Sequence, residues 1–160
     1  MSIDVLDELK NELTARGASI SVAESITGGL VQNAIVELSG SSTFFEGGIT
    51  VYSLDQKHKL LGIEYNHAQS VNCVSSIVAE EMVRGVCEMF GTNVGISTTG
   101  YSEPMLDKGV DYPFAYIAVC VDDVLSVKKI NAVGMRRNEA RSFICNKAIE
   151  LCLEQLKKSE

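Results

Sequence analysis

The hydrophobic positions along this chain recur with two different periods. Apolar residues fall three and four positions apart in several long segments, which is the spacing of an amphipathic helix. Each of these segments begins near a polar residue and most end at glycine, as helices commonly do. The pattern predicts helices over residues 3–16, 30–38, 53–61, 75–90 and 137–156.

Short apolar runs between these segments indicate β-strands. The predicted strands cover residues 18–22, 48–52, 93–97, 114–121 and 124–130. The last two flank Asp122 and Asp123, which predicts a β-hairpin. Residues 63–73 show no clear period and are interpreted as a connection. Strands that alternate with helices and close on a hairpin predict an α/β fold, a single-domain three-layer sandwich whose mixed sheet has helices on both faces.

The turn between the first predicted strand and the second helix is the strongest candidate for a functional site. Residues 23–29 read Ala-Glu-Ser-Ile-Thr-Gly-Gly. The carboxyl end of a strand is where α/β sheets place their ligands, and glycines let a ligand approach the backbone. The alternative is that Thr27 is only a helix N-cap and the glycines only turn residues.

Composition narrows the function classes. The chain has 160 residues, 46% of them hydrophobic, and a formal net charge of −7. This length suits one domain with a sizeable core. The acidic balance argues against a nucleic-acid partner, and no apolar run is long enough to predict a membrane span.

The cysteine pattern favours a reducing compartment without a metal site. The five cysteines are odd in number and widely spaced, and no Cys-x-x-Cys pair exists. We interpret them as free thiols that mainly pack, and we expect a cytoplasmic protein because the chain starts with a charged helical pattern rather than a signal peptide.

Further polar clusters fall at predicted strand ends or helix starts, and they suggest nucleophilic chemistry without histidine. A lysine whose pKa is lowered by burial can take the proton of a serine hydroxyl, and a tyrosine can assist it. Ser25, Tyr52 and Lys57 supply these groups. Hydroxyls around Ser42 and Thr99 could hold an oxyanion, while two arginines could clamp a phosphate.

Each of these residues also has a purely structural alternative. Tyr52 could be an aromatic residue at a strand end, and Lys57 a solvated helix charge. Arg137 and Arg141 could pair on the surface with Glu139 or other acids. Spacing alone does not place any of them in contact.

A series of motifs extends over nearly the whole chain. Besides residues 23–29, these are Gly-Ser-Ser-Thr-Phe-Phe at 40–45, Thr-Val-Tyr-Ser-Leu-Asp-Gln-Lys at 50–57, the segment 74–82, Thr-Gly-Tyr-Ser-Glu-Pro at 99–104 and Arg-Asn-Glu-Ala-Arg at 137–141. In this order they resemble the CinA C-terminal domain, the nicotinamide-nucleotide amidase family.

The resemblance implies one domain over residues 1–160 and an amidohydrolase that uses no metal or cofactor. Its reaction would convert nicotinamide mononucleotide and water to nicotinic acid mononucleotide and ammonia. Ser25 would be the nucleophile and Lys57 the general base, assisted by Tyr52. The implied partners are a small pyridine nucleotide and further copies of the chain in a homo-oligomer, a dimer or larger.

The resemblance also implies a set of substrate-binding residues. They would shape the pocket, orient the carbonyl or, for one of the two arginines, meet the phosphate, which could come from across a subunit interface. These residues are Thr27, Gly28, Gly29, Ser42, Thr99, Gly100, Arg137 and Arg141.

This sequence departs from the family pattern at two places. Ile26 replaces a cysteine, which is a packing change, and residues 101–103 read Tyr-Ser-Glu where the family has Ile-Ala-Gly. Glu103 in the pocket would repel a phosphate at close range. Two alternatives follow from it: a substrate without phosphate or with a cationic group, or a non-catalytic homologue that binds a nucleotide-like ligand or acts as an assembly module.

Overall fold

The computed structural model describes residues 3–159 and confirms the α/β fold with a mixed sheet. The sheet has five strands in the order β2-β1-β3-β4-β5. β2, β1 and β3 run parallel, and β3, β4 and β5 are antiparallel. The strands are β1 (Ile20–Glu24), β2 (Phe45–Thr50), β3 (Val94–Tyr101), β4 (Phe114–Val121) and β5 (Val124–Asn131).

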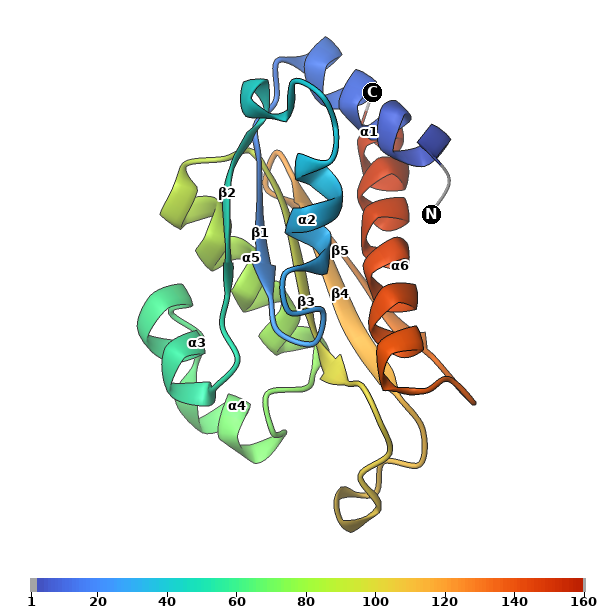
Figure 1. Cartoon of the computed structure of the whole chain (residues 1–160). Helices are drawn as coiled ribbons and strands as arrows, with labels where there is room; N and C mark the ends of the chain where they lie inside the picture. Colours follow the sequence, from blue (N-terminus) through green and yellow to red (C-terminus); the bar gives the residue numbers. More distant parts are fainter. Residues whose placement is uncertain (1–2, 160) are drawn as a thin grey trace.

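Helices cover both faces of the sheet, as Figure 1 shows. One layer holds α1 (Ile3–Arg16), α2 (Leu30–Val36) and α6 (Arg137–Lys158). The other holds α3 (Leu54–Leu61), α4 (Tyr65–Ser70) and α5 (Ser76–Phe90). Short 3₁₀ turns, η1 (Ser41–Thr43) and η2 (Leu106–Lys108), complete the described elements.

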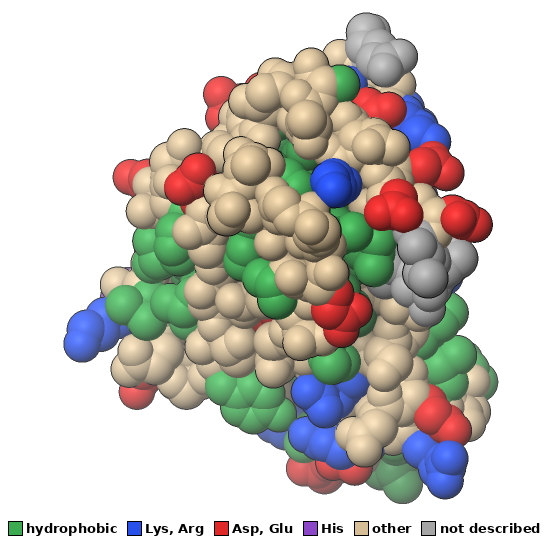
Figure 2. Space-filling view, turned by 45° about the horizontal axis from the view of Figure 1, so that its top comes forward, with side chains coloured by type: hydrophobic (Ala, Val, Ile, Leu, Met, Phe, Trp, Pro, Cys, Tyr) green, Lys and Arg blue, Asp and Glu red, His purple; other side chains and the backbone are tan. Residues whose placement is uncertain are grey.

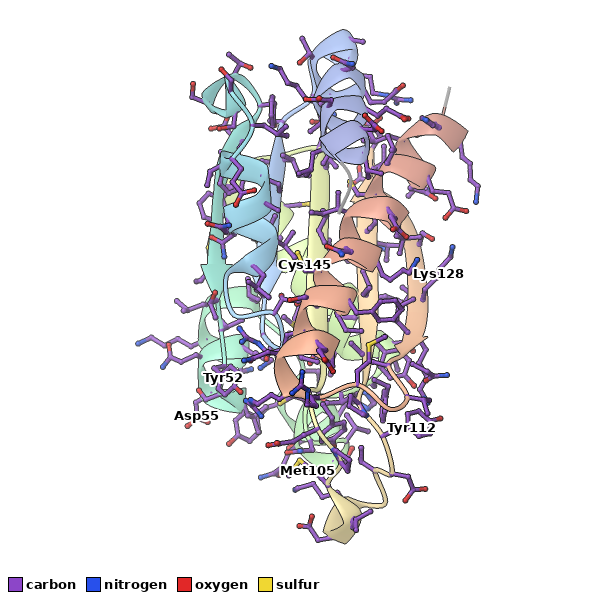
Figure 3. All side chains as sticks on the ribbon, turned by 45° about the vertical axis from the view of Figure 1, so that its right-hand side comes forward. Tyr52, Asp55, Met105, Tyr112, Lys128 and Cys145 are labelled. Carbon is purple, nitrogen blue, oxygen red and sulfur yellow. The ribbon has the colours of Figure 1, made fainter. Side chains whose placement is uncertain are left out.

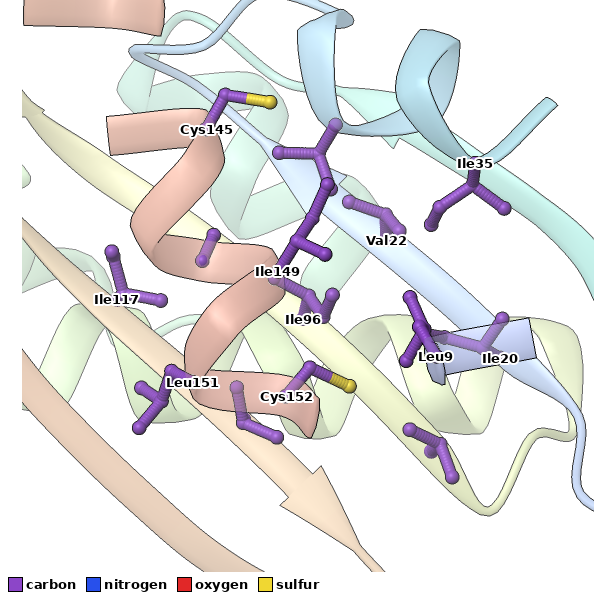
Figure 4. Packing of buried hydrophobic residues seen from close by; sticks show 14 of the residues in the cluster. Leu9, Ile20, Val22, Ile35, Ile96, Ile117, Cys145, Ile149, Leu151 and Cys152 are labelled. Carbon is purple, nitrogen blue, oxygen red and sulfur yellow. The ribbon is translucent and has the colours of Figure 1, made fainter. Parts of the chain in front are cut away.

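Alternation along the central strands divides the core between the two layers. Ile20, Val22 and Ile96 are fully buried and belong to the cluster that also holds Leu9 of α1 and Ile149 of α6 (Figure 4). Ala23, on the opposite side of β1, belongs to a separate cluster with α3 and α5. Because successive side chains of a strand point to opposite faces, a five-residue strand buried at every position supports both layers.

The structure corrects three sequence-based boundaries. Residues 98–100, predicted as a polar turn, continue β3, because β4 pairs with β3 as far as Tyr101. Residues 63–73, interpreted as a connection, contain α4, which Glu64 caps by accepting from two backbone N–H groups. The second strand starts and ends earlier than predicted, at Phe45 and Thr50.

The parallel half of the sheet places three chain segments at one edge. β1, β2 and β3 all end at the lower edge of the sheet in Figure 1, so the residues that follow them converge there. On the face drawn in Figure 2, basic and acidic side chains are interspersed. Among the described residues, no helix is both long and apolar enough to cross a bilayer.

Candidate active site

A cavity of about 400 Å³ opens at the carboxyl ends of the parallel strands. Its walls come from the turn after β1, the segment between β2 and α3, the loop before α5, the end of β3 and the start of α6. Figure 3 shows the labelled Tyr52 and Met105, which both line the cavity, at this end of the molecule. The volume falls in the usual range for a small-molecule site.

Ser25 and Lys57 meet at the wall of this cavity. Lys57 Nζ lies 3.0 Å from Ser25 Oγ. The same nitrogen donates to the backbone carbonyls of Val51, at 2.9 Å, and Tyr52, at 3.3 Å. The two side chains come from different segments, one before α2 and one inside α3, and the fold brings them together as predicted.

The Lys57 amine is held in an environment that disfavours its charge. Its side chain is only 1% exposed, and within residues 3–159 it forms no salt bridge with a carboxylate. Burial lowers the pKa of Lys57, and the nearby Cys73 opposes this effect to a smaller extent. The Cys73 thiol has its own pKa raised by burial. A neutral amine beside a hydroxyl is the arrangement that proton abstraction from serine requires.

A buried carboxylate fixes the helix that follows Ser25. Glu24 is fully buried, and its two carboxylate oxygens accept from the backbone N–H groups of Val31 and Gln32 at 2.9 and 3.1 Å. The Gln32 side chain donates to it as well. Glu24 therefore caps α2, and the alternative that Thr27 is the N-cap is wrong: the N-cap position is Gly29 and carries no side-chain cap.

The turn itself is held from both sides. Thr27 Oγ1 lies 2.7 Å from Thr98 Oγ1 on β3. Arg141 donates to the carbonyls of Ile26 and Thr27 at 3.0 and 3.1 Å. Gly28 has a φ of +56°, and a Cβ there would lie 2.8 Å from the Arg141 guanidinium. The group that approaches this glycine is thus an arginine of the chain itself.

A chain of polar contacts crosses the mouth of the cavity. Arg137 Nη1 lies 2.9 Å from a Glu103 carboxylate oxygen, and Arg137 Nη2 donates to the Tyr52 hydroxyl at 3.3 Å. All three residues line the cavity, and the Arg137 and Glu103 side chains are 47% and 57% exposed. The Tyr52 ring is 67% exposed, so this residue meets Lys57 through its backbone carbonyl while its hydroxyl meets Arg137.

The remaining predicted binding residues divide into two groups. Thr99 and Gly100 line the cavity, although the Thr99 hydroxyl already donates to the Cys73 carbonyl at 2.6 Å. The cavity lining does not include Thr27, Gly28, Gly29, Ser42 or Arg141. Ser42 lies in η1, which precedes β2 and so sits at the opposite edge of the parallel strands from Ser25.

Sequence analysis missed several groups of the site. Glu24 stood inside the motif but was given no role. Asn72 and Cys73 line the cavity with φ of +50° and +62°, in a segment without periodicity. Ile26 also lines it, and its backbone N–H donates to no other group within residues 3–159. The one sequence signal for Ile26 was its place directly after the serine.

Comparison with known proteins gives consistent matches over the length of the chain. The family model described as the CinA C-terminal domain matches residues 3–156. A putative competence-damage inducible protein of Clostridium botulinum (strain Loch Maree / Type A3) is 37% identical over 153 residues, which are 93% of this chain and 36% of that protein. One of the same description from Alkaliphilus oremlandii (strain OhILAs) is 36% identical over 87% of this chain and 34% of its own length. The chain thus spans about a third of the length of these curated relatives.

Solved structures share the fold. A CinA superfamily protein from Klebsiella pneumoniae 700603 superposes with a TM-score of 0.91, covering 97% of each chain at 20% identity. A competence/damage inducible protein from Agrobacterium tumefaciens gives a TM-score of 0.85 at 25% identity, covering 98% of this chain and 99% of that one.

Proposed function

Given that the chain belongs to the CinA C-terminal domain family, we propose that it is an amidohydrolase that uses Ser25 as nucleophile and Lys57 as general base. One observation carries this proposal. The buried Lys57 amine, which forms no salt bridge with a carboxylate within residues 3–159, lies 3.0 Å from the Ser25 hydroxyl at the wall of a cavity. The substrate class that the family resemblance suggests is a pyridine carboxamide, with nicotinamide mononucleotide as the first compound to test.

The hydrogen bonds of Lys57 support its role as a base. A neutral amine has two N–H groups and one lone pair. When the two N–H groups donate to the carbonyls of Val51 and Tyr52, the lone pair remains for the Ser25 hydroxyl proton. Tyr52 thus assists by orienting the amine through its backbone, rather than by relaying a proton through its phenol.

The reaction then follows the usual course of acyl transfer through a serine. Ser25 Oγ attacks the carboxamide carbon as its proton passes to Lys57 Nζ. The tetrahedral intermediate collapses when Lys57 returns that proton to the leaving nitrogen, which departs as ammonia. Water, deprotonated by the same amine, then attacks the acyl carbon, the bond to Ser25 Oγ breaks, and Lys57 returns the proton to that oxygen as the carboxylic acid leaves.

The backbone N–H of Ile26 is the proposed oxyanion donor. It follows the nucleophile directly, lines the cavity, and has no acceptor within residues 3–159. The same arrangement, with the N–H of the residue after the nucleophile, serves this purpose in other serine hydrolases. Thr99 is a weaker candidate because its proton is engaged by Cys73.

Glu103 bears on the substrate rather than on the chemistry. It lines the cavity and forms an ion pair with Arg137. Of the two arginines predicted to bind phosphate, only Arg137 lines the cavity. A substrate phosphate at Arg137 would have to displace this carboxylate or lie beside it. This favours carboxamides without phosphate over nicotinamide mononucleotide.

The test is ammonia release from a panel of carboxamides. Nicotinamide mononucleotide, nicotinamide riboside and nicotinamide would be incubated with the wild type and with Ser25→Ala, which removes only the hydroxyl. We expect ammonia and the matching acid with the wild type alone. No release above the Ser25→Ala level with any compound would refute the amidase.

The second candidate is a binding or assembly protein without turnover, which the carboxylate at the cavity mouth favours. Calorimetry with the same compounds would then show binding without product.

The proposal also includes a cytoplasmic location and a homo-oligomer of two or more copies. Light scattering would measure the number of copies.

A further inference from the structure

A second cavity, of about 390 Å³, lies away from the candidate active site. It is formed by the carboxyl-terminal half of α5, the segment before β3 and the end of β4. Because β3 starts here and ends at the active site, the two cavities lie at opposite ends of that strand. Cys87 and Cys120 both line this second cavity.

The packing of the sheet brings these two cysteines together. Gly95 on β3 is paired with Cys120 on β4 in the antiparallel register. A Cβ on Gly95 would lie only 2.4 Å from Cys87 Sγ, so the thiol of α5 occupies the space that this glycine leaves. Cys87 packs against the small buried cluster that contains Cys120. All five cysteines of the chain are free, and Cys87 and Cys120 share both this cavity and this cluster.

The surroundings give the two thiols different acidities. The hydrogen bond from Cys87, reinforced by the Asp123 backbone N–H and by the charge of Arg84, lowers the pKa of Cys120 to about 7. The same contact with Cys120, together with burial, raises the pKa of Cys87. One sulfur therefore has thiolate character while its neighbour keeps its proton, which suits attack by the first and resolution by the second.

We propose that Cys87 and Cys120 form a peroxide-sensitive dithiol that closes to an intramolecular disulfide between α5 and β4. This proposal does not depend on the amidase. The Cys120 thiolate attacks one oxygen of hydrogen peroxide, the O–O bond breaks, and the products are Cys120 sulfenic acid and hydroxide, which takes up a proton. Cys87 sulfur then attacks the Cys120 sulfur and displaces the hydroxyl as water. In sum, two thiols and one peroxide give one disulfide and two waters.

The test is to map thiols before and after hydrogen peroxide. Reduced protein would be treated with stoichiometric peroxide, quenched, denatured and alkylated with iodoacetamide. Of the five cysteines, we expect alkylation of all before treatment and of about three afterwards, since two enter the disulfide. Peptide mass spectrometry should find Cys87 linked to Cys120 with a loss of about 2 Da, reversed by dithiothreitol.

Single variants separate the two roles. In Cys87→Ser, dimedone should trap a sulfenic acid at Cys120, and no disulfide should form. Cys73→Ser, the matched control with another half-buried thiol removed, should still form the Cys87–Cys120 link. The proposal is overturned if peroxide leaves all five thiols alkylated, links other cysteines, or drives either sulfur to sulfinic acid without a disulfide. The wild-type mapping decides the matter even if a variant fails to fold.

Discussion

Two segments that follow neighbouring parallel strands face the same cavity but are held in opposite ways. The turn after β1, residues 25–29, is fixed by buried contacts from Glu24 and Thr98 and by part-buried ones from Arg141. The loop after β3, residues 102–113, is held at the cavity by an exposed ion pair between Glu103 and Arg137. The turn is therefore attached by contacts inside the protein, and the loop by a contact at the surface.

In the proposed amidase, this difference corresponds to a division between the segment that carries the chemistry and the one that selects the substrate. A nucleophile must stay within hydrogen-bond reach of its base, so the turn that carries Ser25 needs contacts that solvent cannot compete with. A loop held by half-exposed charges can change without disturbing the fold, since exposed ion pairs contribute little stability. The two departures from the family resemblance differ in the same way: Ile26 is a packing change within the turn, whereas residues 101–103, at the end of β3 and the start of the loop, bring in the charge of Glu103.

The largest effect is expected at the base that faces the turn. Lys57→Met should lower kcat/KM by about 10³-fold or more while leaving the cavity filled by a side chain of similar length. In the wild type, kcat/KM should rise with pH through the Lys57 pKa, because only the neutral amine accepts the serine proton. That rise should lie below the usual lysine value of 10.5, since burial lowers the pKa.

A stability measurement checks the same pKa without relying on turnover. The folded Lys57 loses its proton at lower pH than the unfolded one, so between the lowered pKa and 10.5 the unfolded state binds more protons. Deprotonation of Lys57 should therefore make the free energy of unfolding increase with pH across that window. Chemical denaturation of wild type and Lys57→Met at several pH values should show this contribution only in the wild type; equal slopes would contradict the lowered pKa.

The next effect concerns the buried cap beneath the turn. Glu24→Gln replaces one accepting oxygen by an NH₂ group that faces backbone N–H donors, and it removes a negative charge from the start of α2. We expect a loss of about 1–3 kcal/mol in the free energy of unfolding. Glu37→Gln, at the exposed far end of the same helix, is the matched control and should change stability by less than about 0.5 kcal/mol.

The fold could be predicted from sequence because it depends on local signals, whereas the pairing of Ser25 with Lys57 was suggested only through the family resemblance. Helical periods, glycine stops and the Asp122–Asp123 turn, whose φ values are both positive, are encoded within a few residues. Ser25 and Lys57 belong to motifs that mark strand ends, and such ends share an edge in a parallel sheet. The remaining errors come from contacts between distant segments.

Three residues show what local signals cannot supply. Thr98 looks like a turn residue, but pairing with Ile117 on β4 keeps it in a strand. Ser42 follows a helix and precedes a strand, which places it at the amino edge of the sheet rather than at the site. Arg141 lies on the same helix face as Arg137, yet one helical turn further along α6 it donates to backbone carbonyls of the turn.

The two arginines offer a direct comparison of the two segments. Arg141→Ala leaves the Ile26 carbonyl without its donor and the Thr27 carbonyl with the Leu30 N–H alone, and it should cost about 1–3 kcal/mol in the free energy of unfolding. Arg137→Ala breaks an exposed ion pair and should cost less than about 1 kcal/mol. Thermal and urea denaturation of both variants would measure these changes in the free energy of unfolding. If the two variants lose equal stability, the turn and the loop do not differ in how firmly they are held.

The smallest effect is expected at the loop, and it should appear in selectivity rather than in stability. Glu103→Gln removes a negative charge from the cavity mouth and frees Arg137 from its ion pair. A phosphate-bearing carboxamide should then gain about five-fold in kcat/KM relative to the same compound without phosphate, which corresponds to the repulsion of one charge near a solvated surface. Asp107→Asn, on the same loop but outside the cavity lining, should leave the ratio unchanged. If both variants shift the ratio alike, the effect is one of overall charge, and Glu103 has no special part in choosing the substrate.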